Sequence, residues 1–152
     1  MITDTYPAIL QTCKRHAELL AHAKTRLQPR FPLTAASMQQ LDDIGLAFLD
    51  QFSTRFAKLQ DTMGARLFPA VLELAKEPED SAFLDKLHRL EKIGGIPSAT
   101  QWLLLHEMRN EFSHDYPNNP DIQSAILNRA FLLANDMLAV LQHIERFAAR
   151  HS

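Results

Sequence analysis

The sequence predicts an all-α fold, an antiparallel bundle of about five helices. Apolar residues recur three or four positions apart through most of the chain, which is the period of one face of a helix. Only 4 glycines are present, and no run of strict apolar and polar alternation is bounded by turn residues, as a strand would be. The length of 152 residues suits one domain with a sizeable core. Residues 1–152 are therefore expected to form a single helical domain.

Composition excludes several classes of protein. A hydrophobic content of 46% excludes a disordered chain. The formal net charge of -2 argues against a protein that coats nucleic acid through a broad basic face, so any nucleic-acid contact is expected to be local. The single cysteine, Cys13, cannot form an internal disulfide and has no Cys or His neighbour at zinc-site spacing. We expect Cys13 to be a packing residue in a reducing compartment.

The first residues of the chain and its most apolar segment both bear on where the protein is located. No basic and then apolar signal peptide opens the chain. The most apolar segment, residues 125–141, is interrupted by Asn128, Arg129, Asn135 and Asp136, which is unlike a membrane span. These observations predict a cytoplasmic protein without a membrane anchor.

The first two helices follow from periodicity and from proline positions. A helix over about Thr5 to Leu27 is expected to end before Pro29. A longer helix is predicted next, with Thr34 or Ser37 as its cap. Gly64 and Pro69 predict a kink or break near its end. The apolar stripe of this helix comprises Leu41, Ile44, Phe48, Phe52, Phe56, Leu59, Met63 and Leu67.

Three more helices complete the predicted bundle. A short one, about Ser81 to Ile93, is expected to stop at Gly94 in a left-handed cap. The fourth is predicted from Ser98 to about Tyr116, because the following Pro117 disfavours helical geometry in the residue before it. The last is predicted from about Pro120 to Ala149 and carries apolar residues on more than one stripe, which indicates a central or partner-covered helix.

Chemistry-bearing residues are concentrated at the end of the fourth predicted helix. Arg109, Asn110, Ser113, His114 and Tyr116 lie within two helical turns and can share one broad polar face. An arginine holds a phosphate through two parallel hydrogen bonds, and a histidine changes protonation near neutral pH. In RNA cleavage one group removes the ribose 2′-hydroxyl proton, another protonates the leaving oxygen, and an arginine stabilises the phosphorane. No metal and no cofactor are required.

One histidine per chain supplies only one of the two proton-transfer groups that such a reaction uses. We therefore expect the chains to assemble. A two-fold homodimer with this helix at its interface would bring two copies of His114 and of Arg109 to one cleft. The spacing alone also fits an ordinary helix end, where His and Arg serve the helix dipole and capping. Tyr116 likewise fits a ring packed on the bundle with its hydroxyl in solvent.

Other polar residues give weaker signals. The remaining histidines show no pairing at metal-site spacing with each other or with Cys13, so no metal site is predicted. Arg55 and Lys58 fit a solvated helix face, with a minor RNA or partner contact as the alternative.

The motif resembles the signature of the HEPN superfamily. That signature is an Arg, a polar residue, a short spacer and a His, which Arg109, Asn110 and His114 match. The tyrosine at Tyr116, two residues after the His, is similar to the HepT toxin branch in particular.

Two further segments carry the same resemblance. The segment 96–102, leading to residues 105–110, looks like the helix entry of HepT-like proteins, and residues 55–61 resemble their long second helix. The similarity covers roughly residues 35–145. It implies a bundle that dimerises through the motif helices and pairs with a minimal nucleotidyltransferase antitoxin.

The resemblance also implies an activity and residue roles. The activity is that of a metal-independent endoribonuclease toxin, with Arg109 and His114 as the catalytic pair and Asn110 and Ser113 in support. Tyr116 corresponds to the tyrosine that the antitoxin modifies with AMP. The alternative is a non-catalytic HEPN module that serves as partner or substrate-binding subunit of a nucleotidyltransferase.

Overall fold

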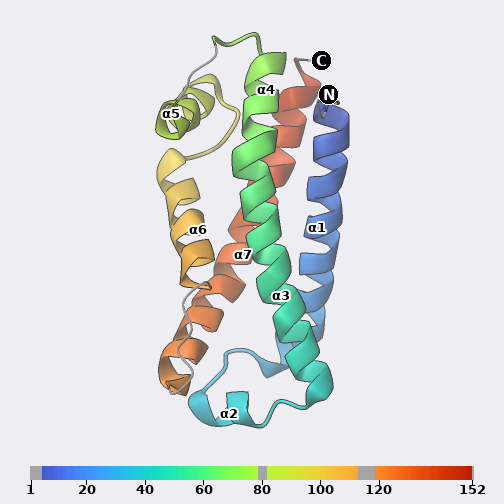
Figure 1. The fold of residues 1–152 in the computed structure, drawn as a ribbon, viewed down its shortest axis with the longest axis vertical. Helices are drawn as coiled ribbons and strands as arrows, with labels where there is room; N and C mark the ends of the chain where they lie inside the picture. The colour runs from blue at the N-terminus through green and yellow to red at the C-terminus, as the bar shows by residue number, and fades with distance from the viewer. Residues whose placement is uncertain (1–4, 79–81, 113–118, 152) are drawn as a thin grey trace.

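The computed structural model describes residues 5–78, 82–112 and 119–151, and these residues contain helices and no strand. The long helices run along one axis, and the first begins at the same end of the molecule at which the last one finishes (Figure 1). The predicted all-α class is confirmed. The described residues contain more helices than predicted, because the long second helix is divided into α2, α3 and α4.

The first helix, α1 (Tyr6–Leu27), matches its prediction closely. The Thr5 side chain accepts a hydrogen bond from the Ala8 amide and so caps the start. The short 3-10 helix η1 (Gln28–Arg30) follows directly. The buried residues of α1 recur at helical spacing and pack along α3: Ile9, Cys13, Leu20, Ala23 and Leu27.

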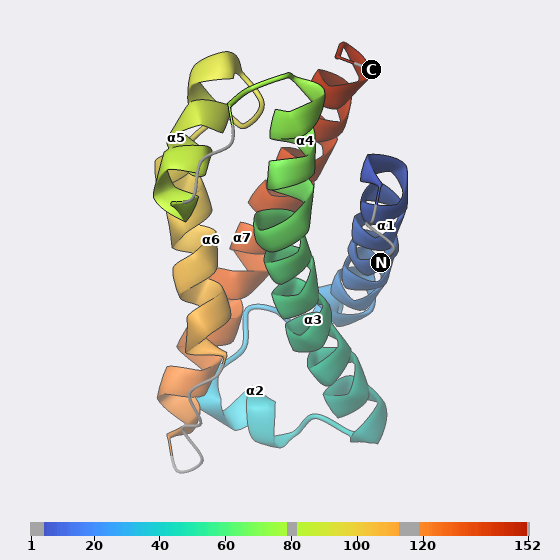
Figure 2. The ribbon, with the colours of Figure 1, turned by 45° about the horizontal axis from the view of Figure 1, so that its top comes forward.

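The predicted long second helix is broken near its start. Thr34 caps only the short α2 (Ala35–Gln39), whereas Asp42 caps α3 (Asp43–Thr62) by accepting from the Gly45 amide at 2.8 Å. Because the chain turns at this break, Ile44 is 68% exposed and does not belong to the buried stripe. From Phe52 onward the stripe is buried as predicted. Figure 2 shows α2 at the foot of the bundle, between the start of α3 and the start of α7, and α2 contacts α7.

The predicted kink near Gly64 is a π-helical turn. The wider turn η2 (Met63–Leu67) joins α3 to α4 (Phe68–Leu74), and the three continue in nearly one line (Figure 1). A π-turn accommodates Pro69 in the first turn of α4, where its missing amide costs no hydrogen bond.

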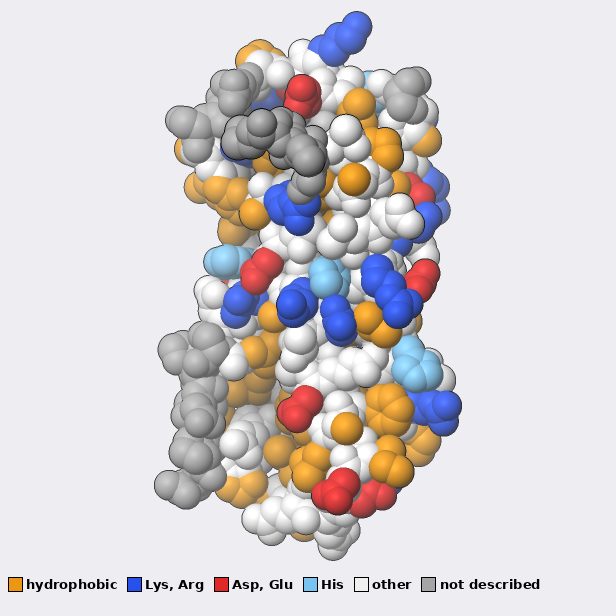
Figure 3. Space-filling model, turned by 45° about the vertical axis from the view of Figure 1, so that its right-hand side comes forward, with side chains coloured by type: hydrophobic (Ala, Val, Ile, Leu, Met, Phe, Trp, Pro, Cys, Tyr) orange, Lys and Arg blue, Asp and Glu red, His pale blue; other side chains and the backbone are white. Residues whose placement is uncertain are grey.

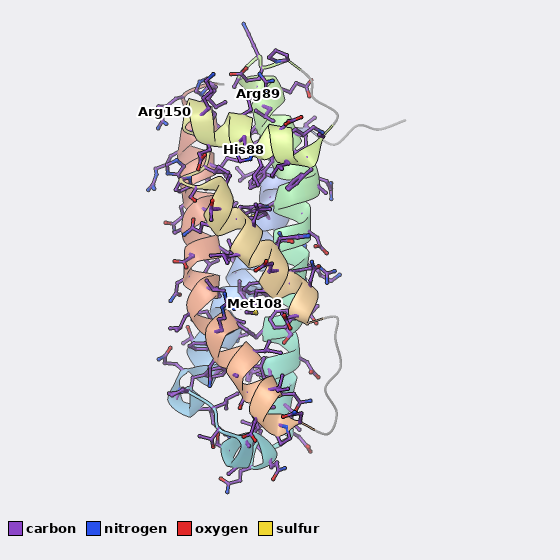
Figure 4. All side chains as sticks on the ribbon, turned by 90° about the vertical axis from the view of Figure 1, so that its left-hand side faces the viewer. His88, Arg89, Met108 and Arg150 are labelled. Carbon is purple, nitrogen blue, oxygen red and sulfur yellow. The ribbon has the colours of Figure 1, made fainter. Side chains whose placement is uncertain are left out.

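The last three helices include α6, which carries Arg109 of the candidate site. The short α5 (Phe83–Ile93) ends at Gly94, whose φ of 90° is the predicted left-handed cap. The next helix, α6 (Ala99–Glu111), is capped by Ser98, and α7 (Pro120–Ala149) has the predicted bounds. Figure 4 shows α5 lying across the bundle, above α6 and α7.

The C-terminal helix supplies much of the core. Its buried residues form one stripe that contacts α1, α2, α4 and α6. At its other edge Ile122 and Leu132 are exposed. The Asn128 side chain bonds the amide and the carbonyl of Leu33 at 2.7 and 2.8 Å and so ties the loop before α2 to α7.

Among the described helices, α7 is long and apolar enough by length and composition to cross a membrane. The charged residues within α7 therefore do not by themselves exclude a membrane span. A core helix of a soluble protein has the same length and composition, and the burial of one face of α7 in this bundle is consistent with a soluble protein.

Candidate functional site

The candidate site is built around Arg109, in the last turn of α6. The start of α6 is held by α5, because Glu91 Oε2 accepts a hydrogen bond from the Ala99 amide at 2.9 Å. The inner face of α6 is buried at helical spacing and ends with Met108, which is labelled in Figure 4 and is 2% exposed. With Met108 fixed against the bundle, the next residue lies at the edge of the helix, half-buried and facing α3.

Arg109 forms a two-bonded ion pair with Asp61 of α3. Arg109 Nε lies 2.9 Å from Asp61 Oδ1, and Nη2 lies 3.0 Å from Oδ2. The Arg109 side chain is 30% exposed and that of Asp61 is 50% exposed. The hydrogen bond to Asp61 raises the pKa of Arg109 and outweighs the opposing effect of burial, so the guanidinium is a permanent cation.

Within the described part of the chain, this geometry leaves N–H donors of Arg109 available to another anion. A guanidinium carries five N–H groups, and the pair with Asp61 uses the edge formed by Nε and Nη2. The second edge, formed by the two Nη atoms, has the spacing that matches two phosphate oxygens. Asp61 thus orients Arg109 and partly neutralises its charge.

A second polar contact lies beside this pair, between Gln60 and His106. Gln60 is 3% exposed, and its Nε2 lies 3.4 Å from Nδ1 of the exposed His106. Because Gln60 and Asp61 are adjacent in α3, and His106 and Arg109 lie one turn apart in α6, the two contacts join the same pair of helices. Together they fix the position of α6 on α3 by polar contacts at the surface.

An apolar groove of about 550 Å³ adjoins the Asp61 carboxylate. It runs over the π-turn past Gly64, where a Cβ atom would lie 3.5 Å from the Trp102 ring. Turns of this kind interrupt helices frequently at functional sites. The residues that line the groove are Gln60, Asp61, Gly64, Ala65, Phe83, Leu84, Leu103 and His106.

Three of the five residues of the predicted site lie outside the described residues. Arg109 is placed as above, and Asn110 is exposed at the surface of α6. Ser113, His114 and Tyr116 belong to residues 113–118, which the structure does not describe. The structure therefore gives no distance between Arg109 and His114.

The fourth predicted helix ends earlier than Tyr116. The structure ends α6 at Glu111, with Phe112 as its C-cap. The Phe112 ring packs edge-on against Phe56 with centroids 5.3 Å apart. Packing of the aromatic side chain on α3 thus sets this helix end, whereas the prediction relied on Pro117 alone.

Sequence reasoning assigned no role to Asp61, Gln60 or His106. Asp61 lies outside the predicted apolar stripe of the long helix, and its partner is 48 positions away. No local spacing reports a contact over that distance. The available signal was an unpaired acidic residue on a helix expected to adjoin that of Arg109.

Two other histidines of the described regions contact backbone carbonyls. His143 Nε2 lies 2.8 Å from the Gly94 carbonyl, and His151 Nδ1 lies 2.9 Å from the Phe147 carbonyl. Within residues 5–78, 82–112 and 119–151, no group of three or more His, Cys, Asp and Glu side chains is placed to hold a metal ion.

Comparison with known proteins adds no relative: no family model matches the chain, and no curated protein or solved structure matches it.

Proposed function

We propose that the protein is a metal-independent endoribonuclease of the HEPN type, a cytoplasmic toxin that cleaves RNA. The single observation that carries the proposal is the state of Arg109. It is held in place by Asp61 through two bonds, it is 30% exposed, and it begins the Arg109 to His114 segment. A cation oriented in this way and open to solvent suits a phosphate that gains charge during reaction.

The proposed chemistry is transesterification at phosphorus. The ribose 2′-oxygen attacks the phosphorus and loses its proton to a base, and the 5′-oxygen leaves with a proton from an acid. His114 acts as acid or base, Arg109 stabilises the phosphorane, and Asn110 with Ser113 orients the phosphate. No metal takes part.

A homodimer is part of the proposal, because one histidine per site does not supply both acid and base. Support comes from exposed apolar side chains on α5 and α6, next to the groove beside Asp61: Phe83, Leu84, Leu103 and Leu104 are 37–49% exposed. An apolar patch of this kind marks an interaction surface. We propose that a second copy covers it and brings a second His114 to the cleft.

Control by a minimal nucleotidyltransferase antitoxin is the last part of the proposal. The Tyr116 phenol would attack the α-phosphate of ATP and release pyrophosphate. The added phosphate would then occupy Arg109 and exclude RNA.

A non-catalytic HEPN module is the second candidate, and the Asp61 pair favours it. An arginine whose charge is already matched by a carboxylate has a structural reason to be present. In that case the protein would hold a nucleotidyltransferase or present its substrate.

Expression in a bacterial host without a nucleotidyltransferase tests the proposal. We expect the wild type to arrest growth and degrade RNA, and His114→Ala to do neither. The matched control is His88→Ala, which removes an exposed histidine of α5 (Figure 4) and should arrest growth like the wild type. Equal growth and intact RNA in all three strains, with each protein soluble, would refute the toxin and leave the binding module.

A further inference from the structure

A second cluster of basic residues lies on α1 and α3, apart from Arg109. Arg55 Nη1 of α3 lies 3.0 Å from His16 Nδ1 of α1. Lys58 follows Arg55 by one turn of α3 and is exposed, whereas Arg55 and His16 are half-buried. Figure 3 shows Lys, Arg and His side chains gathered in a band across the middle of the face that contains α1 and α3.

The contact between His16 and Arg55 fixes the protonation of the ring. Burial lowers the pKa of His16, and the nearby charges of Arg55 and Lys58 lower it further. At neutral pH the ring is therefore uncharged, and its Nδ1 accepts the hydrogen bond that Arg55 donates. A neutral histidine thus orients a half-buried arginine, while its Nε2 remains a donor.

The cluster has no matching carboxylate in the described part of the chain. Neither Arg55 nor Lys58 forms an ion pair there, whereas Arg15 pairs with Glu18 and Arg109 with Asp61. Two cations one turn apart repel each other, and the repulsion lowers the stability of the helix unless an anion lies between them. The chain has a net charge of -2, so this basic cluster is a local feature.

The cluster also leads to the Arg109 site. Arg55, Lys58 and Asp61 are spaced three residues apart along α3, and the ridge from Arg55 to Asp61 rises about 9 Å. Arg109 is attached to the end of that ridge through Asp61. Arg55, Lys58 and Arg109 thus form a row of cations with one carboxylate, Asp61, bound to its far end, and such a row suits a chain of phosphates better than a compact anion.

We propose that His16, Arg55 and Lys58 form a phosphate-binding site for the backbone of single-stranded RNA, adjacent to Arg109. This site holds a second phosphate of the RNA strand that Arg109 and His114 are proposed to cleave. In that respect it rests on the proposed function. His16 and Arg55 hold one phosphate between the two helices, and Lys58 approaches it from the exposed side. The contacts are to the backbone, so binding is independent of base sequence.

RNA binding without cleavage tests the site. The His114→Ala protein is titrated with a fluorescent single-stranded oligoribonucleotide at several salt concentrations. The substitutions Arg55→Gln and Lys58→Gln are then added together. The matched control removes two positive charges elsewhere, through Arg129→Gln and Arg146→Gln on exposed positions of α7. Circular dichroism checks that each protein is folded.

We expect the Arg55 and Lys58 substitutions to weaken binding about tenfold or more, and the control to change it little. The slope of log K against log salt should fall by about 0.7 for each phosphate that the variant no longer neutralises. In a nuclear magnetic resonance titration, the pKa of His16 should rise when the oligoribonucleotide is added, because a phosphate then offsets Arg55 and Lys58.

The outcomes separate this site from the proposed nuclease. If the wild type fails to cleave RNA but binding depends on Arg55 and Lys58, the nuclease is refuted and the site stands. If binding is absent, or equal in the test and control variants, the site is overturned whether or not RNA is cleaved. If the Arg55 and Lys58 substitutions abolish binding to a poly-glutamate peptide but leave RNA binding unchanged, the site is overturned in favour of an acidic protein partner.

Discussion

Asp61 and Arg109, 48 positions apart in the chain, meet through two parallel hydrogen bonds of 2.9 and 3.0 Å. The contact joins the end of α6 to α3 at the surface. It orients the guanidinium on which the proposed chemistry depends, so Asp61 is a positioning residue.

A double-mutant cycle measures this pair. The free energy of unfolding is determined for the wild type, Asp61→Asn, Arg109→Gln and the double variant. We expect a coupling of about 0.5–1 kcal/mol, because the pair is half-exposed but bonded at two points. The control cycle uses Arg15 and Glu18, which are 67% and 68% exposed, are joined by one contact, and should couple by about 0.3 kcal/mol. Equal coupling in both cycles would show that the second bond adds nothing.

The pH dependence of stability tests the environment of His16. Its folded pKa lies below the ordinary value of 6.5, chiefly through burial and then through Arg55 and Lys58. The unfolded chain therefore binds the proton first as the pH falls, and stability decreases below about pH 6.5 until the folded pKa is reached. Urea denaturation between pH 5 and 7.5 should show a smaller decrease for His16→Gln. An identical pH profile for the two proteins would mean that His16 is not perturbed.

Cys13 should be inert in the folded protein. It is buried, and burial raises the pKa of its thiol to about 12. At pH 8 only about one thiol in ten thousand is then ionised, and reaction with Ellman's reagent should need unfolding. The measurement compares the reaction rate in buffer with the rate in urea. A rate in buffer equal to that in urea would contradict the burial.

The apolar patch on α5 and α6 predicts how the protein assembles. The substitutions Leu103→Glu and Leu104→Glu place negative charge in this patch. In sedimentation experiments they should convert a dimer to a monomer. Leu132→Glu serves as the control, because Leu132 is 70% exposed on α7 and should leave the dimer intact. A wild type that sediments as a monomer at the concentrations of the RNA assay would refute the proposed dimer.

Some elements of the fold followed from local signals. Thr5, Gly94 and Ser98 act at single helix ends, and their side chain or backbone geometry was sufficient to place those ends. The break before α3 was missed because the apolar spacing runs through it. There, the Asp42 cap outweighs the pattern and leaves Ile44 in solvent.

The sequence predicted only those residues of the candidate site that lie close together in one segment of the chain. Arg109 was identified from its neighbours in sequence, and its exposure agrees with that role. Asp61 and the contact between His16 and Arg55 depend on how α3 packs against α6 and α1. Such packing is tertiary information that linear spacing does not carry.

Cleavage of RNA by the purified protein tests the central claim most directly. A labelled single-stranded RNA is incubated in EDTA with the wild type, His114→Ala, Arg109→Ala and the control His88→Ala. We predict cleavage by the wild type and by the control, with the rate reduced at least about 100-fold in the other two. Intact RNA with the wild type, or equal cleavage by wild type and His114→Ala, would contradict the proposed nuclease.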